Sequence, residues 1–244
     1  MRQSAVTVSQ GSLSQHRAPL RAMQEIFAKN AALKQSLKVS LSSPRFARYN
    51  AAAKGDDLRA IAIYHWNVKL SQSLYTYLQA WEICFRNRMN EFLCWKYNCN
   101  WPYDERRARR QLTRMDQSRL QDAIVRQEKT RGLKPAPLPA IVADLSAGFW
   151  VSQVSKSYEI PYAWRHNLAR IFPHDRALDM RSAWTICDEL LTLRNRIAHH
   201  EPIFYLPLEQ RHRDLQRAVA AMCPGTHAFA EASCAFMETW NTRP

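Results

Sequence analysis

Glycine is scarce in this sequence: only 5 of the 244 residues are glycine. Because tight turns between strands often need glycine at positive φ, this scarcity disfavours a sheet-rich fold. No glycine pattern of the dinucleotide-binding or phosphate-loop kind is present, which excludes Rossmann and P-loop enzymes. Ala, Leu, Arg and Gln recur throughout instead, and they favour helices.

Long apolar runs are missing as well. No run of about 18 apolar residues occurs, so a membrane-spanning helix is not expected. The N-terminus also lacks the apolar stretch of roughly 7 to 15 residues that marks an export signal. We therefore expect a cytoplasmic protein without membrane contact.

Closely paired cysteines are absent. The six cysteines form no C-x-x-C pair, and most lie in apolar helical patterns, where cysteine behaves as a small hydrophobic residue. Cys94 and Cys99 have the spacing of half a metal site, but no second pair of matching ligands follows them. We expect reduced cysteines, no metal and no cofactor.

Acidic residues are few relative to basic ones. Lys and Arg number 35 against 21 Asp and Glu, which gives a net charge of +14 and a pI of about 9.9. Most of the basic residues are Arg, whose planar guanidinium suits phosphate. The surplus favours a polyanionic partner, although a merely basic surface has the same composition.

Helical periodicity is the strongest pattern that the sequence does contain. After a capping residue at Asp56 or Asp57, apolar residues recur mostly every three or four positions up to about Tyr97. This pattern predicts one long helix. Its apolar face comprises Ile63, Trp66, Leu70, Leu74, Tyr77, Leu78, Trp81, Phe85, Met89 and Phe92.

Shorter helices are expected on both sides of this long one, and the fold class is therefore all-α. Residues 1–16 are polar and aperiodic, and 135–139 is a proline-rich extended connector. We expect a partly helical N-terminal extension at 1–40 and one helical domain at 41–244. The further helices are predicted at 20–38, 44–49, 104–131 (strongly basic), 141–145, 164–171, 175–200, 207–221 and 226–240.

Arg194 stands out on the helix that Asp175 is expected to cap. The apolar face of this helix reads Met180, Ala183, Cys187, Leu190, then Arg194, then Ile197. A guanidinium thus occupies a position where the period predicts a hydrophobic residue. Because a buried unpaired charge is costly, Arg194 either meets an acidic partner or lines a cleft for a charged ligand.

Asn195 and His199 lie four residues apart on one face of this helix, and the long side chain of Arg194 reaches toward the same side. Histidine moves a proton near neutral pH and arginine neutralises charge on a phosphate, so the pair suits metal-free cleavage of RNA by its own 2′-hydroxyl. The alternative is a structural Arg–Glu pair with a helix-end histidine. Spacing alone does not separate the two.

The segment Trp81–Asn90 of the long helix is similar in sequence to the segment Leu193–Ile197, since both contain Arg-Asn-Arg. Glu82, Arg86 and Asn87 follow Trp81 on the long helix, beside its apolar face. If the two helices pack antiparallel, Glu82 comes near Arg194 or Arg196. The alternative is an ordinary Glu82–Arg86 pair within the helix, which stabilises a protein by only roughly 0.3 to 0.5 kcal/mol.

At these residues the sequence resembles the Abi-like (abortive infection) family, a branch of the HEPN superfamily. The resemblance runs from Leu41 to the penultimate helix, and its five motifs occur in order. They are Leu41-Ser-Ser-Pro-Arg-Phe-Ala-Arg-Tyr49, Tyr64-His-Trp-Asn67, the helix with Trp81-Glu82 and Arg86-Asn87, Asp144-Leu-Ser-Ala-Gly-Phe-Trp150, and Leu193-Arg-Asn-Arg-Ile-Ala-His-His200.

The superfamily signature is an Arg followed four to six residues later by a His, and Arg194, Asn195 and His199 match it. His200 also has the required spacing, and His199 is preferred because it shares a face with Asn195. The resemblance implies a HEPN-like bundle on two long antiparallel helices. It also implies a homodimer and a metal-independent endoribonuclease that leaves 2′,3′-cyclic phosphate and 5′-hydroxyl ends.

The resemblance further suggests a role in phage defence or as a toxin, with an antitoxin or defence-system partner. Because the superfamily includes members that bind without cutting, a non-catalytic RNA-binding or partner-binding module is the main alternative. A helical dimer with no RNA partner is a third.

Several basic and aromatic residues are candidates for contact with RNA. The candidates for phosphate contact are the basic 104–131 helix, Arg165, Arg170 and Arg176, although a solvated surface also explains such charges. The candidates for base stacking are Trp95, Trp101, Phe149 and Trp150, although aromatic residues at helical spacing are more often core.

Overall fold

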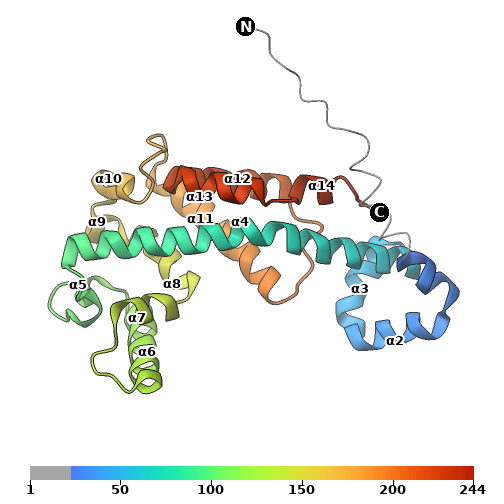
Figure 1. Cartoon of the computed structure of the whole chain (residues 1–244), viewed down its shortest axis with the longest axis horizontal. Coiled ribbons are helices and arrows are strands. Elements are labelled where there is room, and N and C mark those ends of the chain that lie inside the picture. Colours follow the sequence, from blue (N-terminus) through green and yellow to red (C-terminus); the bar gives the residue numbers. More distant parts are fainter. Residues whose placement is uncertain (1–22) are drawn as a thin grey trace, which may run out of the picture. The chain divides into compact units, whose positions relative to one another are not determined.

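The computed structural model describes residues 23–244. All regular elements in this part of the chain are helices, and no strand occurs in it (Figure 1). The all-α prediction is therefore confirmed. The predicted polar segment 1–16 and the start of the first predicted helix lie outside the described residues.

The chain forms two compact units. Of the described residues, the first comprises 23–75 together with Arg196–Leu208 and Cys234–Pro244, and the second comprises Thr76–Asn195 and Glu209–Ser233. Each unit contains segments that lie far apart in the sequence. The predicted boundary near residue 40 stays a prediction.

Helix α4 (Asp57–Tyr97) has 41 residues and contributes to both units. The Asp56 carboxylate caps it by accepting the backbone N–H groups of Leu58 at 2.9 Å and Arg59 at 3.1 Å. All ten residues of the predicted apolar face are at most 7% exposed. The long-helix prediction is thus confirmed in both its limits and its buried face.

The first unit also contains α2 (Ala31–Leu41), α3 (Ser43–Ala52) and α14 (Phe236–Trp240). The helix predicted to reach Lys38 without a break is interrupted at Asn30, because the Asn30 side chain accepts the amide of Leu33 at 3.0 Å and starts a new helix. The core of this unit includes Phe46, Tyr49, Ala53, Ala60, Ile61 and Ile63.

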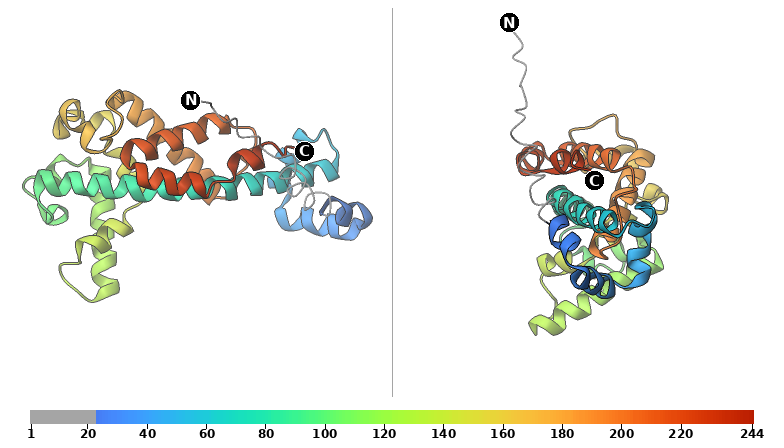
Figure 2. Two further views of the ribbon diagram at one scale, coloured as in Figure 1. Left: turned by 45° about the horizontal axis from the view of Figure 1, so that its top comes forward. Right: turned by 90° about the vertical axis from the view of Figure 1, so that its right-hand side faces the viewer.

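The second unit consists of the remainder of α4 and a series of shorter helices. Within it, α6 and α7 lie side by side (Figure 1 and Figure 2). Its helices are η1 (Trp101–Tyr103), α5 (Ala108–Gln111), α6 (Arg114–Arg131), α7 (Leu138–Asp144), α8 (Ala147–Ser152), η2 (Lys156–Tyr158), α9 (Glu159–Tyr162), α10 (Trp164–Asn167), η3 (Leu168–Arg170), α11 (Met180–Ala198), α12 (Leu208–Met222) and α13 (Pro224–Ala232). Residues 196–198 of α11 and Leu208 of α12 belong to the first unit.

The second of the two long helices predicted for the bundle is shorter than expected. Helix α11 begins at Met180 because Asp179, not Asp175, caps it, accepting the N–H of Ser182 at 2.7 Å. Asp175 instead accepts a hydrogen bond from the Arg217 guanidinium at 2.8 Å. Both aspartates are suited to capping, and Asp175 also accepts the N–H of Ala177 at 3.1 Å, which closes a turn ahead of the helix.

The predicted basic helix at 104–131 is wrong as one element. It divides into α5 and α6 because Thr113 caps α6, its side chain accepting the N–H of Asp116 at 3.2 Å. The helices predicted at 164–171 and 226–240 are divided as well, into α10 with η3 and into α13 with α14.

Asp116 is the centre of a buried polar network in the second unit. Its carboxylate is 1% exposed and accepts hydrogen bonds from Tyr158 at 2.6 Å, Thr113 at 3.0 Å and Arg119 at 3.0 Å. Burial, together with the bond to Asp116, raises the pKa of Tyr158 to about 12, so its hydroxyl remains a donor at neutral pH. This network connects the first turn of α6 to η2.

Replacing Asp116 with alanine is expected to lower the free energy of unfolding by about 3 kcal/mol, because buried donors are left without an acceptor. Urea unfolding followed by circular dichroism measures the change. Asp122→Ala is the matched control, since Asp122 is exposed on the same helix, and a change within about 0.5 kcal/mol is expected there. Equal midpoints for the two variants would contradict the role given to Asp116.

Candidate active site

Arg194 lies beside the apolar face of α11 and does not interrupt it. The buried face runs through Ala183, Cys187, Leu190 and Leu193. Because this face passes from Leu190 to Leu193 at a three-residue step, no hydrophobic residue is needed at position 194. The side chain of Arg194 is 38% exposed. The expectation that this guanidinium replaces a core residue is therefore wrong.

Glu82 on α4 binds Arg194. The sequence similarity between the Trp81–Asn90 and Leu193–Ile197 segments predicted this contact. The Arg194 Nε atom donates to Oε2 of Glu82 at 2.9 Å, and Nη2 donates to Oε1 at 3.5 Å. Both residues belong to the second unit. An ion pair this exposed stabilises a fold by no more than about 1 kcal/mol. Its main effect is to fix the direction of the guanidinium.

The remaining nitrogen of this guanidinium, Nη1, lies 3.4 Å from the side-chain oxygen of Asn195. Asn195, the residue of the predicted signature that directly follows Arg194, is exposed. The polar groups of these two adjacent side chains are therefore both accessible to solvent. Glu82 binds the Nε and Nη2 atoms of Arg194 and fixes the position of its guanidinium.

Arg86 and Asn87 are not part of this arrangement. Glu82 is paired with Arg194, so the alternative of a Glu82–Arg86 pair within the helix is not realised. In the described part of the chain the Nε atom of Arg86 is buried and has no hydrogen-bond partner. Asn87 instead lines a groove of about 510 Å³ between α4 and α13, together with Arg88 and Phe229.

Arg196 holds the loop that follows α11. Its Nη1 atom donates to the Tyr205 hydroxyl at 2.8 Å and to the Glu201 carboxylate at 3.3 Å. The same hydroxyl accepts a hydrogen bond from Arg48 at 3.1 Å. Of the two arginines that the sequence left open as partners of Glu82, Arg194 takes that place and Arg196 belongs to the first unit.

His199 and His200 follow the last residue of α11, and both are exposed. His200 adopts φ of 56° in the left-handed region, and its N–H bonds to the carbonyl of Ile197 at 3.0 Å. It therefore ends the helix, whereas His199 has no such backbone role. Both histidines belong to the first unit, and Arg194 and Asn195 to the second.

Asn67 fixes the loop beyond the histidines, a role that sequence reasoning missed. Its side-chain oxygen accepts the N–H groups of Ile203 at 2.7 Å and Phe204 at 3.1 Å. The ring of Phe204 packs on Tyr49 with centroids 5.4 Å apart, and Tyr64 meets Tyr49 at 5.2 Å. Residues of the first two family-like motifs thus position the segment after His200.

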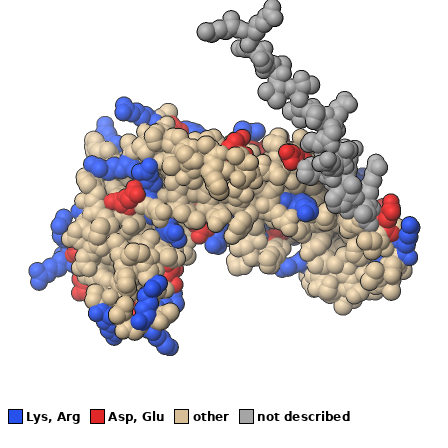
Figure 3. All heavy atoms as spheres, viewed as in Figure 1, with Lys and Arg blue, Asp and Glu red and all other residues tan. Residues whose placement is uncertain are grey.

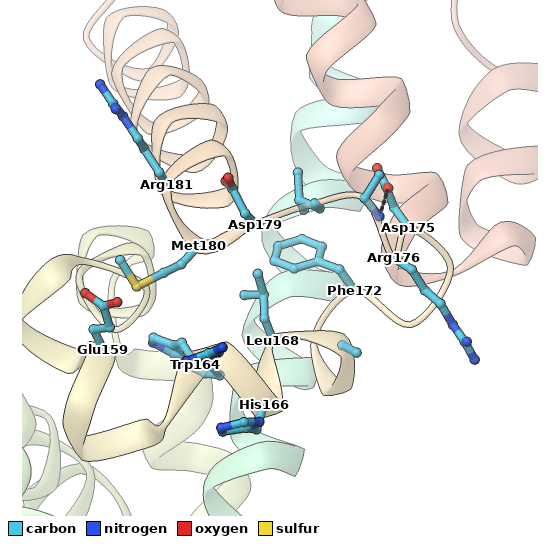
Figure 4. A pocket seen from close by; sticks show the side chains of 14 residues that line it. Glu159, Trp164, His166, Leu168, Phe172, Asp175, Arg176, Asp179, Met180 and Arg181 are labelled. Atoms are coloured by element: carbon cyan, nitrogen blue, oxygen red, sulfur yellow. Dashed lines mark hydrogen bonds between the residues drawn. The ribbon is translucent and has the colours of Figure 1, made fainter.

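The hollow drawn in Figure 4 lies at the start of α11 and not at the candidate pair. It measures about 780 Å³, and its walls include Trp164, Phe172 and Met180. Trp164 and Phe172 are at most 1% exposed, so they offer a ligand little surface. Arg176 and Arg181 point outward from it (Figure 4). Arg194 is not among its lining residues.

Three of the four aromatic candidates for base stacking are core residues. Trp101, Phe149 and Trp150 are at most 1% exposed, whereas Trp95 is 53% exposed. Burial thus assigns the first three to packing, as the helical spacing favoured.

Comparisons with protein-family models, with curated proteins and with solved structures found no match. Within the described residues, no helix is long and apolar enough to cross a membrane. Residues 23–244 also contain no group of three or more His, Cys, Asp or Glu side chains arranged as metal ligands.

Proposed function

We propose that this chain is a metal-independent endoribonuclease of the Abi-like HEPN type, with Arg194 and His199 as its catalytic pair. The observation that supports it best is the fixed but accessible guanidinium of Arg194, held by Glu82 at 2.9 Å while 38% of the side chain stays exposed. A cation oriented in advance stabilises charge that develops on a phosphate.

The proposed chemistry needs no group beyond RNA and the side chains. His199 removes the proton of a 2′-hydroxyl, and the 2′-oxygen attacks the adjacent phosphorus. The bond to the 5′-oxygen breaks, and this oxygen takes up a proton as it leaves. Arg194 neutralises the charge that builds on the phosphate oxygens, and the products are a 2′,3′-cyclic phosphate and a 5′-hydroxyl.

The same proposal includes a homodimer, in which the pair occurs twice, and a role in phage defence or as a toxin with an antitoxin or defence-system partner. It rests on the signature residues and on the basic balance of +14. The RNA partner accounts for the Arg surplus, since phosphate contacts supply most of the affinity of such proteins.

A second candidate is an RNA-binding module on the same fold that does not cut. The pairing of Arg194 with Glu82 also fits this candidate, because a carboxylate at 2.9 Å offsets part of the charge that the guanidinium would direct at the phosphate. The two candidates differ in their products, since only the nuclease generates new RNA ends.

The test is an analysis of RNA ends after incubation of the purified full-length protein with total RNA, with and without EDTA. We expect 2′,3′-cyclic phosphate and 5′-hydroxyl ends in equal yield under both conditions. Retained but intact RNA would replace the nuclease with the binding module. Fragments with 5′-phosphates that disappear on adding EDTA would contradict the metal-independent mechanism.

A further inference from the structure

Trp95 is an exposed indole near the C-terminal end of α4. The buried face of the helix at this level is formed by Phe92, which is 2% exposed and packs against Trp164 with ring centroids 4.6 Å apart. Trp95, three residues later, is turned outward and is 53% exposed. The fold therefore leaves a large aromatic surface in contact with water.

An arginine lies directly on this indole. The guanidinium carbon of Arg170 is 3.6 Å from the centroid of the Trp95 ring, a close cation–π contact. Arg170 comes from η3, so the contact joins two elements of the second unit. Because the guanidinium is held by a ring and not by a carboxylate, its N–H groups stay available to an anion.

Two further cations lie near the same end of α4, around the ring of Tyr97. The guanidinium carbon of Arg107 is 6.0 Å, and the Lys96 Nζ atom 5.5 Å, from the centroid of the Tyr97 ring. No ion pair found among residues 23–244 involves Lys96, Arg107 or Arg170. Figure 3 shows Lys and Arg side chains over α5, α6 and α10 of this unit, with Asp and Glu side chains among them. The Asp104 carboxylate lies near Arg107, whose backbone N–H it accepts at 2.9 Å, so Arg170 is the cation of this region whose side chain is held by a ring alone.

We propose that Trp95, Lys96, Arg107 and Arg170, here called the Trp95 platform, bind a single-stranded segment of RNA. Unpaired bases have exposed faces that stack on indole or guanidinium planes, and phosphates pair with the neighbouring cations. A base-paired duplex hides those faces. This inference rests on the proposed function and adds where the substrate strand is held.

The recognition is expected to be tolerant of sequence. Stacking uses the face that every base has, and the cations contact phosphates that every nucleotide carries. The platform therefore provides affinity and leaves the choice of the cleaved bond to the catalytic residues.

The experiment measures RNA binding in the His199→Ala background, so that the RNA stays intact during the measurement. The probe is a short fluorescein-labelled oligouridine, and anisotropy gives its Kd at several salt concentrations. Trp95→Ala is expected to weaken binding by about ten-fold, and Trp95→Phe by less, because a phenyl ring still stacks. Arg170→Ala is expected to weaken binding and to reduce the slope of log Kd against log salt by about 1.

Two matched controls separate this site from general effects. Trp184→Ala removes another exposed tryptophan, 39% exposed on α11, and Arg59→Ala removes a charge from an exposed position near the start of α4. Both are expected to change Kd by less than about two-fold. An unlabelled duplex RNA is expected to compete more weakly than the single strand.

Unchanged Kd and unchanged salt slope in both Trp95→Ala and Arg170→Ala would overturn the platform. This failure is distinguishable from failure of the proposed catalysis. If the wild type leaves RNA uncut while Trp95→Ala still weakens binding, the nuclease proposal fails and the platform stands. If the wild type cuts RNA and the platform variants bind it normally, the platform alone fails.

Discussion

His199→Ala is expected to reduce RNA cleavage by about 10² to 10⁴-fold, the usual loss when a general acid–base group is removed. The imidazole is exposed directly after the last residue of α11, so the substitution removes no core contact. Circular dichroism and RNA retention are therefore expected to match those of the wild type. Cleavage is measured with purified protein on total RNA, with the cyclic-phosphate ends counted.

The control for this variant is its neighbour, His200. Because His200 has φ of 56°, alanine would add backbone strain there, whereas asparagine accepts the left-handed region more readily. We expect His200→Asn to keep cleavage within a few-fold of the wild type. Cleavage by His199→Ala equal to that of the wild type would remove His199 from the mechanism, and loss in His200→Asn alone would transfer the role to His200.

Arg194→Ala is the second variant with a large expected effect, a loss of about 10² to 10³-fold in cleavage, as for removal of one oriented group that stabilises an oxyanion. Arg194→Lys is expected to recover little of it. Lysine keeps the charge but lacks the planar fork that meets both oxygens of Glu82. Stability is expected to fall by no more than about 1 kcal/mol, since the pair is part-exposed.

Glu82 tests whether this pair acts by positioning. Glu82→Gln keeps an acceptor but loses the charge, and we expect a smaller loss in kcat, about ten-fold, with little change in KM. In the double variant with Arg194→Ala the effect of Glu82→Gln should vanish, because Glu82 then has no guanidinium to orient. Arg181→Ala, which removes an exposed arginine from α11, is the charge-matched control for Arg194→Ala.

The opposite result would identify a structural pair. If Arg194→Ala lowers the free energy of unfolding by several kcal/mol while the folded variant cleaves RNA at the wild-type rate, the pair of Arg194 and Glu82 only stabilises the fold. That outcome would favour the alternative that the spacing of the residues left open.

The long helix could be predicted well because many residues along it carry the helical pattern. Ten apolar residues at regular intervals define α4, and one capping aspartate starts it. Shorter helices depend on single capping residues, and there the prediction fails. Asp175 and Asp179 are equally suited to start α11, and Thr113 starts α6 within a charged run whose polar pattern gave no sign of a break.

The candidate site was predicted in part for the right reason. The similarity of the two segments led to the Glu82–Arg194 contact, whereas the argument from an interrupted apolar face was wrong because Leu193 continues that face. The role of Asn67 has no local signal beyond a polar residue on a buried stretch of helix. The exposure of Trp95 likewise depends on which neighbours cover the end of α4, information that spacing does not contain.

The Asn67 amide bears on how the pH dependence of cleavage is read. The loop after His200 is fastened by hydrogen bonds from two backbone N–H groups to a carboxamide oxygen, and none of these groups gains or loses a proton under ordinary conditions. This anchor therefore keeps its strength as the solution is made more acidic. The Asn67 bonds therefore contribute no pH dependence of their own to cleavage.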